Sequence, residues 1–400
     1  MAGGGAGPAV TVCTDAAEFA ALREEWNRLH RSSPTATPFQ SHAWLHSWWL
    51  SYGDAGALRV VLVRRGGRLV AAAPLMRRMR PFPVLTPLGA GISDFGDVLV
   101  DEEAGEYAVE ALGAGLWRLA GSAVVDLREV RPGSAAMTLH DNWPGLRRRF
   151  DDSACLELPA LPMDDLVQRL PRPRAQRARA KMRKLDATGI ERRVVPAAEV
   201  DASVRRLLDL HQLQWQERKV TTEHVKPRFA EHLSRSAALM AATGDAVVTE
   251  FSLDGSVVAA DLTFVSPRLA GGYLYGAHPQ LRERKIDVAT MLLRSCTQHL
   301  QEGARSQVLS LLRGTEPYKM HWRPEQLVNQ RLLLARPGSA PQLAALLAAI
   351  GARSGAKRAR QVWRERRGGG PAEGGGGPPR GGPGPGGAAP PRQGGEGGTE

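Results

Sequence analysis

The spacing of apolar residues alternates along the chain between a period of two, typical of strands, and a period of three to four, typical of helices. In the second half it predicts, in order, a strand at Ile190–Val195, helices at Asp201–Arg218 and Pro227–Ala242, strands at Ala246–Leu253, Ser256–Phe264 and Gly271–Gly276, a helix from Asp287 to Leu300, a strand at Gln307–Leu312, a short helix or turn at Glu316–Trp322 and a strand at Leu327–Ala335. Asp254-Gly255 is a strong signal for a two-residue hairpin turn. The predicted order is β-α-α-β-β-β-α-β-α-β.

The first half predicts nearly the same order. Its elements are a strand at Val10–Cys13, helices near Ala16–His30 and Ala43–Tyr52, strands at Leu58–Arg64 and Arg68–Leu75, a strand at Asp97–Val100, a helix at Glu103–Leu119 and a strand at Ala123–Leu127. Gly66-Gly67 supplies a second hairpin turn. We therefore expect an α/β (α+β mixed sheet) fold built from two similar units, residues 1–170 and 171–337, although no sequence repeat is visible.

Composition sets the ends of the globular part. The 400 residues are 42% hydrophobic, enough for one large core or two ordinary ones. Residues 368–400 contain no aromatic or branched aliphatic residue, so we expect a disordered tail rich in Gly and Pro. A C-terminal helix is expected before it, at residues 338–367.

Cysteine content and apolar runs indicate a compartment. Cys13, Cys155 and Cys296 are far apart and odd in number, which offers no disulfide framework. No N-terminal signal sequence is evident, and no apolar run approaches the ~20 residues of a membrane span. We expect a soluble cytoplasmic protein. Its formal charge of +12 favours contact with an anionic partner.

Several short segments resemble the CelD/BcsL-type (cellulose-biosynthesis-type) acetyltransferases of the GNAT superfamily, a group distantly related to the FemAB peptidyltransferases. The matching segments are PFQSHAWLHSWW at 38–49, LVAAAPL at 69–75, SDFGDVLV at 93–100, RAQRARAKMRKLDATG at 174–189, LDGSVVAADLTF at 253–264, YLYGAHPQL at 273–281 and LLRGTEPYKMHW at 311–322. The resemblance implies tandem GNAT-like domains with the reactive end in the second.

The resemblance also implies a reaction: an acyl group passes from a thioester, acyl-CoA or an acyl carrier protein, to a small-molecule or peptidyl amine by direct attack in a ternary complex. No permanently bound cofactor is expected, since acyl-CoA is a co-substrate. Two alternatives remain open, a non-catalytic GNAT-like scaffold and a FemAB-like transferase that uses charged tRNA. Nucleic acid is otherwise not expected as a partner, because no RNA-binding motif is present.

The family places the donor beside the strand that ends at Gly276 and the helix after it, where backbone amides bind phosphate. The residues expected there are Tyr275, Arg284, Lys285, Val288, Ala289 and Thr290. The family pattern has glycines in this loop, but residues 282–290 contain none. Arg284 and Lys285 would replace lost backbone contacts with charge.

The strongest catalytic candidates lie in residues 314–322. The family comparison makes Glu316 the general base and Tyr318 the acid that protonates the leaving thiolate. Lys319 resembles a FemAB lysine that helps to bind an anionic substrate. Replacement of Lys319 by Met is expected to abolish turnover with thermal stability nearly unchanged. The alternative is that Tyr318 and Trp322 merely form the inner face of a short helix.

Two further sets of residues are candidates for substrate binding. Arg177 and Lys181 belong to a basic helix at 174–185 that either docks an anionic donor or acidic carrier protein, or simply carries solvated charges. Asp94 and Asp97 either orient the acceptor amine across the domain interface or cap turns.

Histidines and tryptophans near residue 45 suggest no further chemistry. His42 and His46 are four apart but lack a third ligand, so no metal site is expected. Trp44, Trp48 and Trp49 are expected in the core or at the domain interface.

Overall fold

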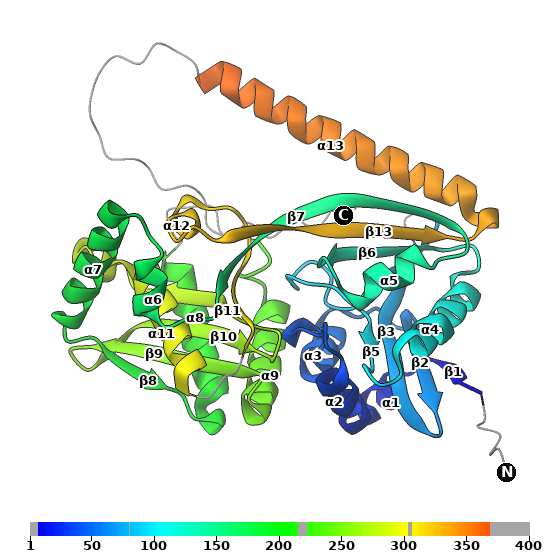
Figure 1. Cartoon of the computed structure of the whole chain (residues 1–400), viewed down its shortest axis with the longest axis horizontal. Helices are drawn as coiled ribbons and strands as arrows, with labels where there is room; N and C mark the ends of the chain where they lie inside the picture. Colours follow the sequence, from blue (N-terminus) through cyan, green and yellow to red (C-terminus); the bar gives the residue numbers. More distant parts are fainter. Residues whose placement is uncertain (1–6, 80, 215–221, 303–305, 369–400) are drawn as a thin grey trace, which may run out of the picture.

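The computed structural model describes residues 7–79, 81–214, 222–302 and 306–368 of the chain, which form an α/β fold around one large mixed sheet (Figure 1). The expected disordered tail lies outside the described residues, apart from Gly368. The strands are β1 (Ala9–Cys13), β2 (Leu58–Arg65), β3 (Arg68–Met79), β4 (Pro83–Pro87), β5 (Leu99–Val100), β6 (Val124–Val130), β7 (Leu146–Pro159), β8 (Glu191–Val194), β9 (Ala246–Leu253), β10 (Ser256–Val265), β11 (Leu269–Ala277), β12 (Val308–Arg313) and β13 (Glu325–Ala335).

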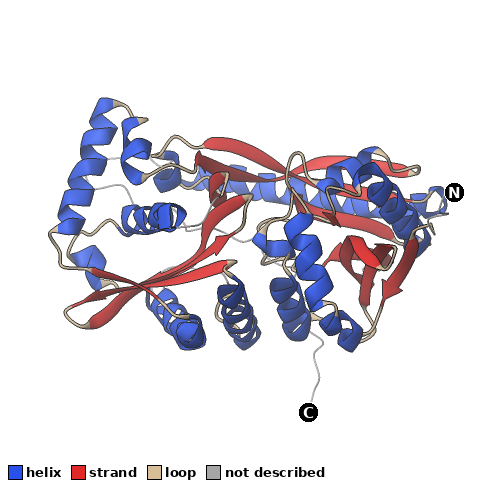
Figure 2. Cartoon of the chain, turned by 60° about the horizontal axis from the view of Figure 1, so that its bottom comes forward, coloured by secondary structure: helices blue, strands red, loops and turns tan. Residues whose placement is uncertain are grey.

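Helices cover both faces of this sheet (Figure 2). The α-helices are α1 (Ala16–Ala21), α2 (Arg23–Ser32), α3 (His42–Tyr52), α4 (Gly105–Ala120), α5 (Ala135–Asp141), α6 (Met163–Gln168), α7 (Arg172–Asp186), α8 (Val200–Gln214), α9 (Pro227–Thr243), α10 (Gln280–Glu283), α11 (Val288–Glu302), α12 (Pro317–Met320) and α13 (Ala340–Gly368). Among the helices of the described ranges, none combines the length and apolar content needed to span a bilayer.

The strand order reads the same from both ends of the sheet. It is β1-β2-β3-β4-β6-β13-β7-β12-β11-β10-β9-β8, with β5 paired to β3. The first five strands of this list therefore correspond one by one to β8, β9, β10, β11 and β12. The two central strands are exchanged, because β13 from the second half pairs with β6 and β7 from the first half pairs with β12. β7 and β13 also pair with each other over their whole length.

The predicted hairpin turns are confirmed. Gly66 and Gly67 join β2 to β3 with φ of 56° and 80°. Asp254 and Gly255 join β9 to β10 with φ of 52° and 77°. Positive φ at both central positions is the geometry that matches the twist of paired strands.

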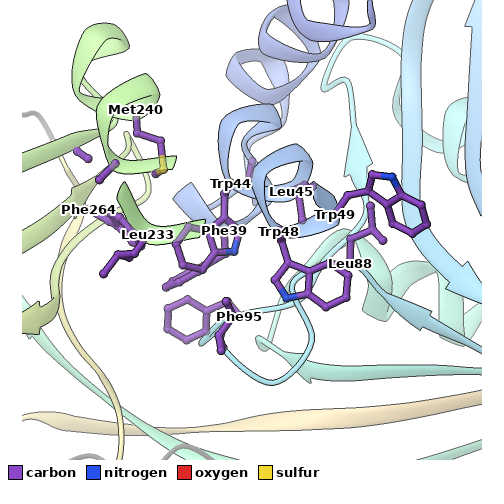
Figure 3. Close-up of a cluster of buried hydrophobic side chains, with 14 of the residues drawn as sticks. Phe39, Trp44, Leu45, Trp48, Trp49, Leu88, Phe95, Leu233, Met240 and Phe264 are labelled. Carbon is purple, nitrogen blue, oxygen red and sulfur yellow. The ribbon is translucent and has the colours of Figure 1, made fainter. Parts of the chain in front are cut away.

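Aromatic residues hold the two halves together. Trp44 and Trp48 of α3 are buried, as predicted, and α3 packs on α9 of the second half (Figure 3). The Trp44 ring contacts those of His232 and Phe264 at centroid distances of 4.4 and 5.2 Å. Large buried aromatic rings supply much apolar contact per residue, so this interface is part of one continuous core.

Some elements differ from the sequence prediction. The helix expected at Ala16–His30 is two helices, and the predicted end of the Asp201 helix at Arg218 lies outside the described residues. β7 was not predicted, because its start is a run of exposed arginines at 147–149 that hides the strand pattern. α13 occurs where a C-terminal helix was expected, and Leu343 packs it against β6 and β13.

Candidate functional site

The parallel strands β11 and β12 part soon after they meet. They pair only at Leu269–Val308 and Ala270–Leu309, although β11 continues to Ala277. The parting exposes backbone groups of two strands toward the same space, which is where a ligand can add to a sheet edge. This opening lies in the second half of the chain.

The corresponding opening in the first half is filled. β4 and β6 are also parallel and pair at only two positions, but Gly96 then bridges to Val130. The Gly96 amide donates to the Glu129 carbonyl at 2.9 Å, and a Cβ on Gly96 would overlap with the Arg128 carbonyl. Phe95 beside it is buried. No isolated bridge of this kind closes the second opening within the ranges the structure describes.

A cleft of about 240 Å³ lies at the carboxyl end of β11 and the start of α11. Its lining residues come from the end of α8, the end of β11, the α10 turn and the first turn of α11: Gln214, Ala277, His278, Pro279, Leu281, Arg282, Ile286, Asp287, Val288 and Ala289. Two predicted donor residues, Val288 and Ala289, are among them. A larger and more open hollow, of about 600 Å³ and lined by Pro132, Met137 and Arg149 among others, contains no candidate residue.

Asp287 caps the helix that borders the cleft. Its Oδ1 accepts from the Thr290 amide at 2.8 Å, which occupies the amide of one predicted donor residue. Its Oδ2 lies 2.6 Å from Lys181 Nζ. Burial alone would raise the pKa of Asp287, but Lys181 and the Thr290 amide hold it below its usual value. The carboxylate is therefore neutralised locally, and its repulsion of a phosphate is reduced.

Arg284 and Lys285 do not line this cleft. The Arg284 guanidinium lies 3.4 Å from Asp254 on the surface. The carbonyls of Arg284 and Lys285 accept from Lys184 Nζ at 2.9 and 3.1 Å, so α7 braces the loop from outside. The cation in the lining is Arg282, which the sequence analysis missed because three basic residues follow one another closely here.

Tyr275 connects the cleft to the catalytic candidates. Its hydroxyl accepts from Gln214 Nε2 at 3.1 Å, and its carbonyl oxygen lies 2.7 Å from His211 Nδ1. Burial raises the pKa of Tyr318, and the nearby Tyr275 and Glu316 raise it further. A tyrosine with a raised pKa stays protonated at neutral pH, which suits a proton donor. Tyr318 is nevertheless 41% exposed, so it lies at the rim of the site.

Glu316 and Lys319 form a buried ion pair. Lys319 Nζ lies 2.9 Å from Glu316 Oε2 and donates to the Arg313 carbonyl at 2.7 Å. Gly314 has φ of 102°, and a Cβ there would overlap with the Glu316 carboxylate. Glycine is therefore required for the turn that brings Glu316 back to Lys319.

Asp94 reaches from the first half into the opening of the second. Its Oδ1 lies 2.5 Å from Arg313 Nε at the end of β12. The Arg313 guanidinium also contacts Glu129 of β6 at 2.8 Å, and Tyr273 of β11 donates to the Ile92 carbonyl at 2.9 Å. The loop that carries Asp94 thus touches both strands that part. Arg313 and Glu129 carried no signal in the sequence, because the contacts join residues up to 219 positions apart.

Asp97 lies apart from this group and caps α5. Its carboxylate accepts from Thr35 Oγ1 and from the amides of Val98 and Ala136, each at 2.8 Å. Burial raises its pKa to about 6 although these donors oppose the shift. The geometry favours capping, one of the two roles expected from the sequence.

Arg177 lies on the exposed side of α7, whereas Ala175 and Ala178 are buried. Elsewhere, the His42 and His46 rings stack at 5.2 Å. Among the described residues, no group of three His, Cys, Asp or Glu side chains could hold a metal ion.

Comparisons with known proteins agree with the position of the site. Residues 172–320 match the family model of the acetyltransferase (GNAT) domain. No curated protein matches the chain at a significant level.

Three solved structures share the fold. A conserved protein of unknown function from Bacteroides thetaiotaomicron is 11% identical with a TM-score of 0.57, and the match covers 82% of this chain and 100% of that chain. FemX is 10% identical with a TM-score of 0.56, over 78% and 95% of the two chains. The C-terminal domain of a putative lysylphosphatidylglycerol synthetase from Agrobacterium fabrum is 12% identical with a TM-score of 0.50, over 84% and 97%.

At these identities the three structures show the likeness of fold alone, and the family match carries the chemistry. It spans the strands that part, the cleft and the segment from Glu316 to Lys319. Residues 172–320 are therefore a GNAT acetyltransferase domain, and this domain makes the chain an acyltransferase.

Proposed function

We propose that the chain transfers an acyl group from a thioester, acyl-CoA in its free form, to an amine by direct attack in a ternary complex. The observation that carries this proposal is the parting of β11 and β12 beside the cleft at the start of α11. Glu316 and Tyr318 follow β12 at the same opening. Direct attack needs two substrates held together, a base and an acid, and no covalent intermediate.

The donor occupies the cleft in this proposal. Asp287 uses the Thr290 amide, so the first helical amides, of Val288 and Ala289, are the ones that face a phosphate at the start of α11. Arg282 adds a positive charge to the lining. Tyr275 lies between this cleft and Tyr318, along the path that a pantetheine arm would follow.

The acyl transfer needs two proton movements. Glu316 takes a proton from the acceptor ammonium, directly or through water, and the nitrogen lone pair attacks the thioester carbonyl. The C–N bond forms, the C–S bond breaks, and Tyr318 protonates the leaving sulfur. The second proton of the new amide nitrogen returns to the Tyr318 phenolate.

Lys319 acts through Glu316 in this scheme. Its ammonium is buried between Glu316 and the Arg313 carbonyl, so it serves as a positioning residue rather than as a surface site for an anion. Asp94 is proposed to orient the acceptor, since it lies at the opening from the side of the first half.

The segments that resemble CelD/BcsL-type acetyltransferases support assignment to that branch. The mirrored strand order supports two tandem GNAT-like units, of which the second is catalytic because the first has its opening filled by Phe95 and Gly96. Three buried free cysteines are compatible with the proposed cytoplasmic location.

The test combines donor binding with thiol release. Calorimetric titration with acetyl-CoA, a longer acyl-CoA and CoA should show micromolar binding, and a panel of amines should then release free thiol. Glu316→Gln and Tyr318→Phe should each lower kcat by about 100-fold or more at unchanged donor affinity. Glu325→Gln and Tyr107→Phe are the controls. Silence of the wild-type protein with every thioester would overturn the proposal.

A further inference from the structure

We propose that the surface formed by α7 and α12 docks an acidic carrier protein that delivers the acyl group on a pantetheine arm. This inference rests on the proposed thioester chemistry and names the partner that brings the thioester. It is carried by a line of positive side chains on α7 and by two exposed apolar side chains on α12 beside it.

The cationic line consists of Arg174, Arg177, Lys181 and Lys184. Spacings of three and four place these side chains along one side of the helix, over about 15 Å. All four are exposed, and neither Arg174 nor Arg177 has an ion pair within the part of the chain that the structure describes. Two unpaired guanidinium groups next to each other favour an anionic partner.

One end of the cationic line touches the donor cleft. Lys181 pairs with Asp287, which lines the cleft, and Lys184 holds the carbonyls of the loop before α11. Burial lowers the pKa of His321, and the charges of Lys181, Arg174 and Arg177 lower it further, so the line also runs beside α12. The buried side of α7 packs in one cluster with Trp322 just after α12. Figure 1 shows α7 and α12 on the same end of the molecule.

An apolar pair completes the surface. Tyr318 and Met320 are each 41% exposed, while Lys319 between them points into the protein. Exposed apolar side chains bordered by charged ones are typical of protein interfaces, with aromatic residues, Met and Arg enriched. A partner would therefore bury Tyr318 and Met320 while its carboxylates meet Arg174 and Arg177.

This combination favours a folded acidic protein over nucleic acid. A phosphate backbone gains nothing from Met320, and the described part of α7 carries no aromatic residue for base stacking. Asp186 and Asp287 at the same surface would repel a polyphosphate more than a protein that offers separate carboxylates. A carrier protein also accounts for the position of the surface, because a thioester on a flexible arm has to reach the neighbouring opening.

The test measures docking without an acceptor. A fluorescently labelled bacterial acyl carrier protein in its holo form is titrated with the full-length protein, and CoA binding is measured in parallel by calorimetry. Arg174→Glu with Arg177→Glu should weaken carrier binding at least 10-fold and leave CoA affinity within about 2-fold. Carrier binding should also weaken as salt is raised from 50 to 300 mM.

The matched control reverses two charges on the opposite flank of the same helix. Arg179→Glu with Arg183→Glu makes the same change in net charge, and both residues are exposed, so carrier binding should change less than 3-fold. Equal losses for both double variants would overturn the docking surface, as would failure of the wild-type protein to bind the carrier. Tighter binding of an RNA hairpin that depends on Arg174 and Arg177 would overturn it in favour of nucleic acid. CoA binding without carrier binding rejects this inference and leaves the proposed function standing.

Discussion

At the scale of single residues, buried ionisable groups are the most informative feature of the second half. Glu316 and Lys319 have side chains only 11% and 6% exposed and hold each other at 2.9 Å. An ion pair removed from water contributes little to stability as a pair, but loss of one partner leaves a buried charge without compensation. This changes what a substitution at Lys319 is expected to do.

Lys319→Met should abolish transfer and also lower the free energy of unfolding by about 3 kcal/mol, because Glu316 is left unpaired. The nearly unchanged stability expected from the sequence does not fit a buried pair. Urea denaturation and thiol release measure the two effects. The double variant with Glu316→Gln should recover most of the stability and none of the activity. Full activity in the single variant would remove Lys319 from the mechanism.

Asp261 gives a pH dependence. It is 2% exposed, accepts one hydrogen bond from Thr263 at 2.7 Å, and burial raises its pKa to about 7. The unfolded chain ionises first as pH rises, so the wild type loses stability through Asp261 between about pH 4 and 7. Asp261→Asn should therefore be more stable than the wild type at pH 8, by on the order of 3 kcal/mol, and about equal at pH 4.

Denaturant titrations at the two pH values measure this difference. Asp126→Asn is the control, because Asp126 is bound by Arg331 at 2.6 Å and its replacement should destabilise at pH 8. A difference between Asp261→Asn and wild type that is the same at pH 4 and pH 8 would contradict the prediction.

At the scale of elements, two strand pairs of the same type have different fates. β4 and β6 part and are bridged again through Gly96, whereas β11 and β12 part beside the cleft. The difference depends on one close approach, because only glycine lets the chain pass the Arg128 carbonyl. The filled opening is thus a packing feature of the first half, separate from donor binding.

Gly96→Ala should destabilise the protein by about 1–3 kcal/mol, because the added Cβ forces the bridging segment away from β6. The affinity for CoA should change less than 2-fold, since the cleft lies in the other half. Thermal denaturation and calorimetry provide the two readouts. Gly91→Ala, at a positive φ but in open space, serves as the backbone control. Loss of CoA binding at full stability would place the donor in the first half instead.

At the scale of the whole molecule, the exchange of β7 and β13 makes the halves interdependent. β13 lies between β6 and β7, and β7 lies between β13 and β12. The buried contact of α3 with α9 adds a second connection. A unit boundary near residue 170 therefore separates the chain in sequence but not in the sheet.

Residues 1–170 and 171–337, expressed separately, should each fail to form a monodisperse folded protein, because each would expose the edge of a central strand. Mixed after co-expression, they should assemble into a species that binds CoA. Size-exclusion chromatography and circular dichroism measure the outcome. A soluble fragment 171–337 that binds CoA alone would contradict this interdependence.

Local patterns alone predicted much of this protein. Hairpin turns at Gly66-Gly67 and Asp254-Gly255 and most strands and helices follow from preferences that act over a few residues. The segment from Glu316 to Lys319 was found in the same way, because its candidates are close in sequence. Residues 1–170 and 171–337 were recognised as similar for this reason too.

Only the tertiary structure decided the strand exchange, the choice between the two openings and the contact of Asp94 with Arg313 and Glu129. Each depends on residues far apart in sequence, and apolar periodicity records whether a side chain is buried but not which partner buries it. The same limit explains why Arg284 was expected at the donor site and Arg282 lines the cleft. The sequence determined which residues could do the chemistry, and long-range packing determined which of them meet.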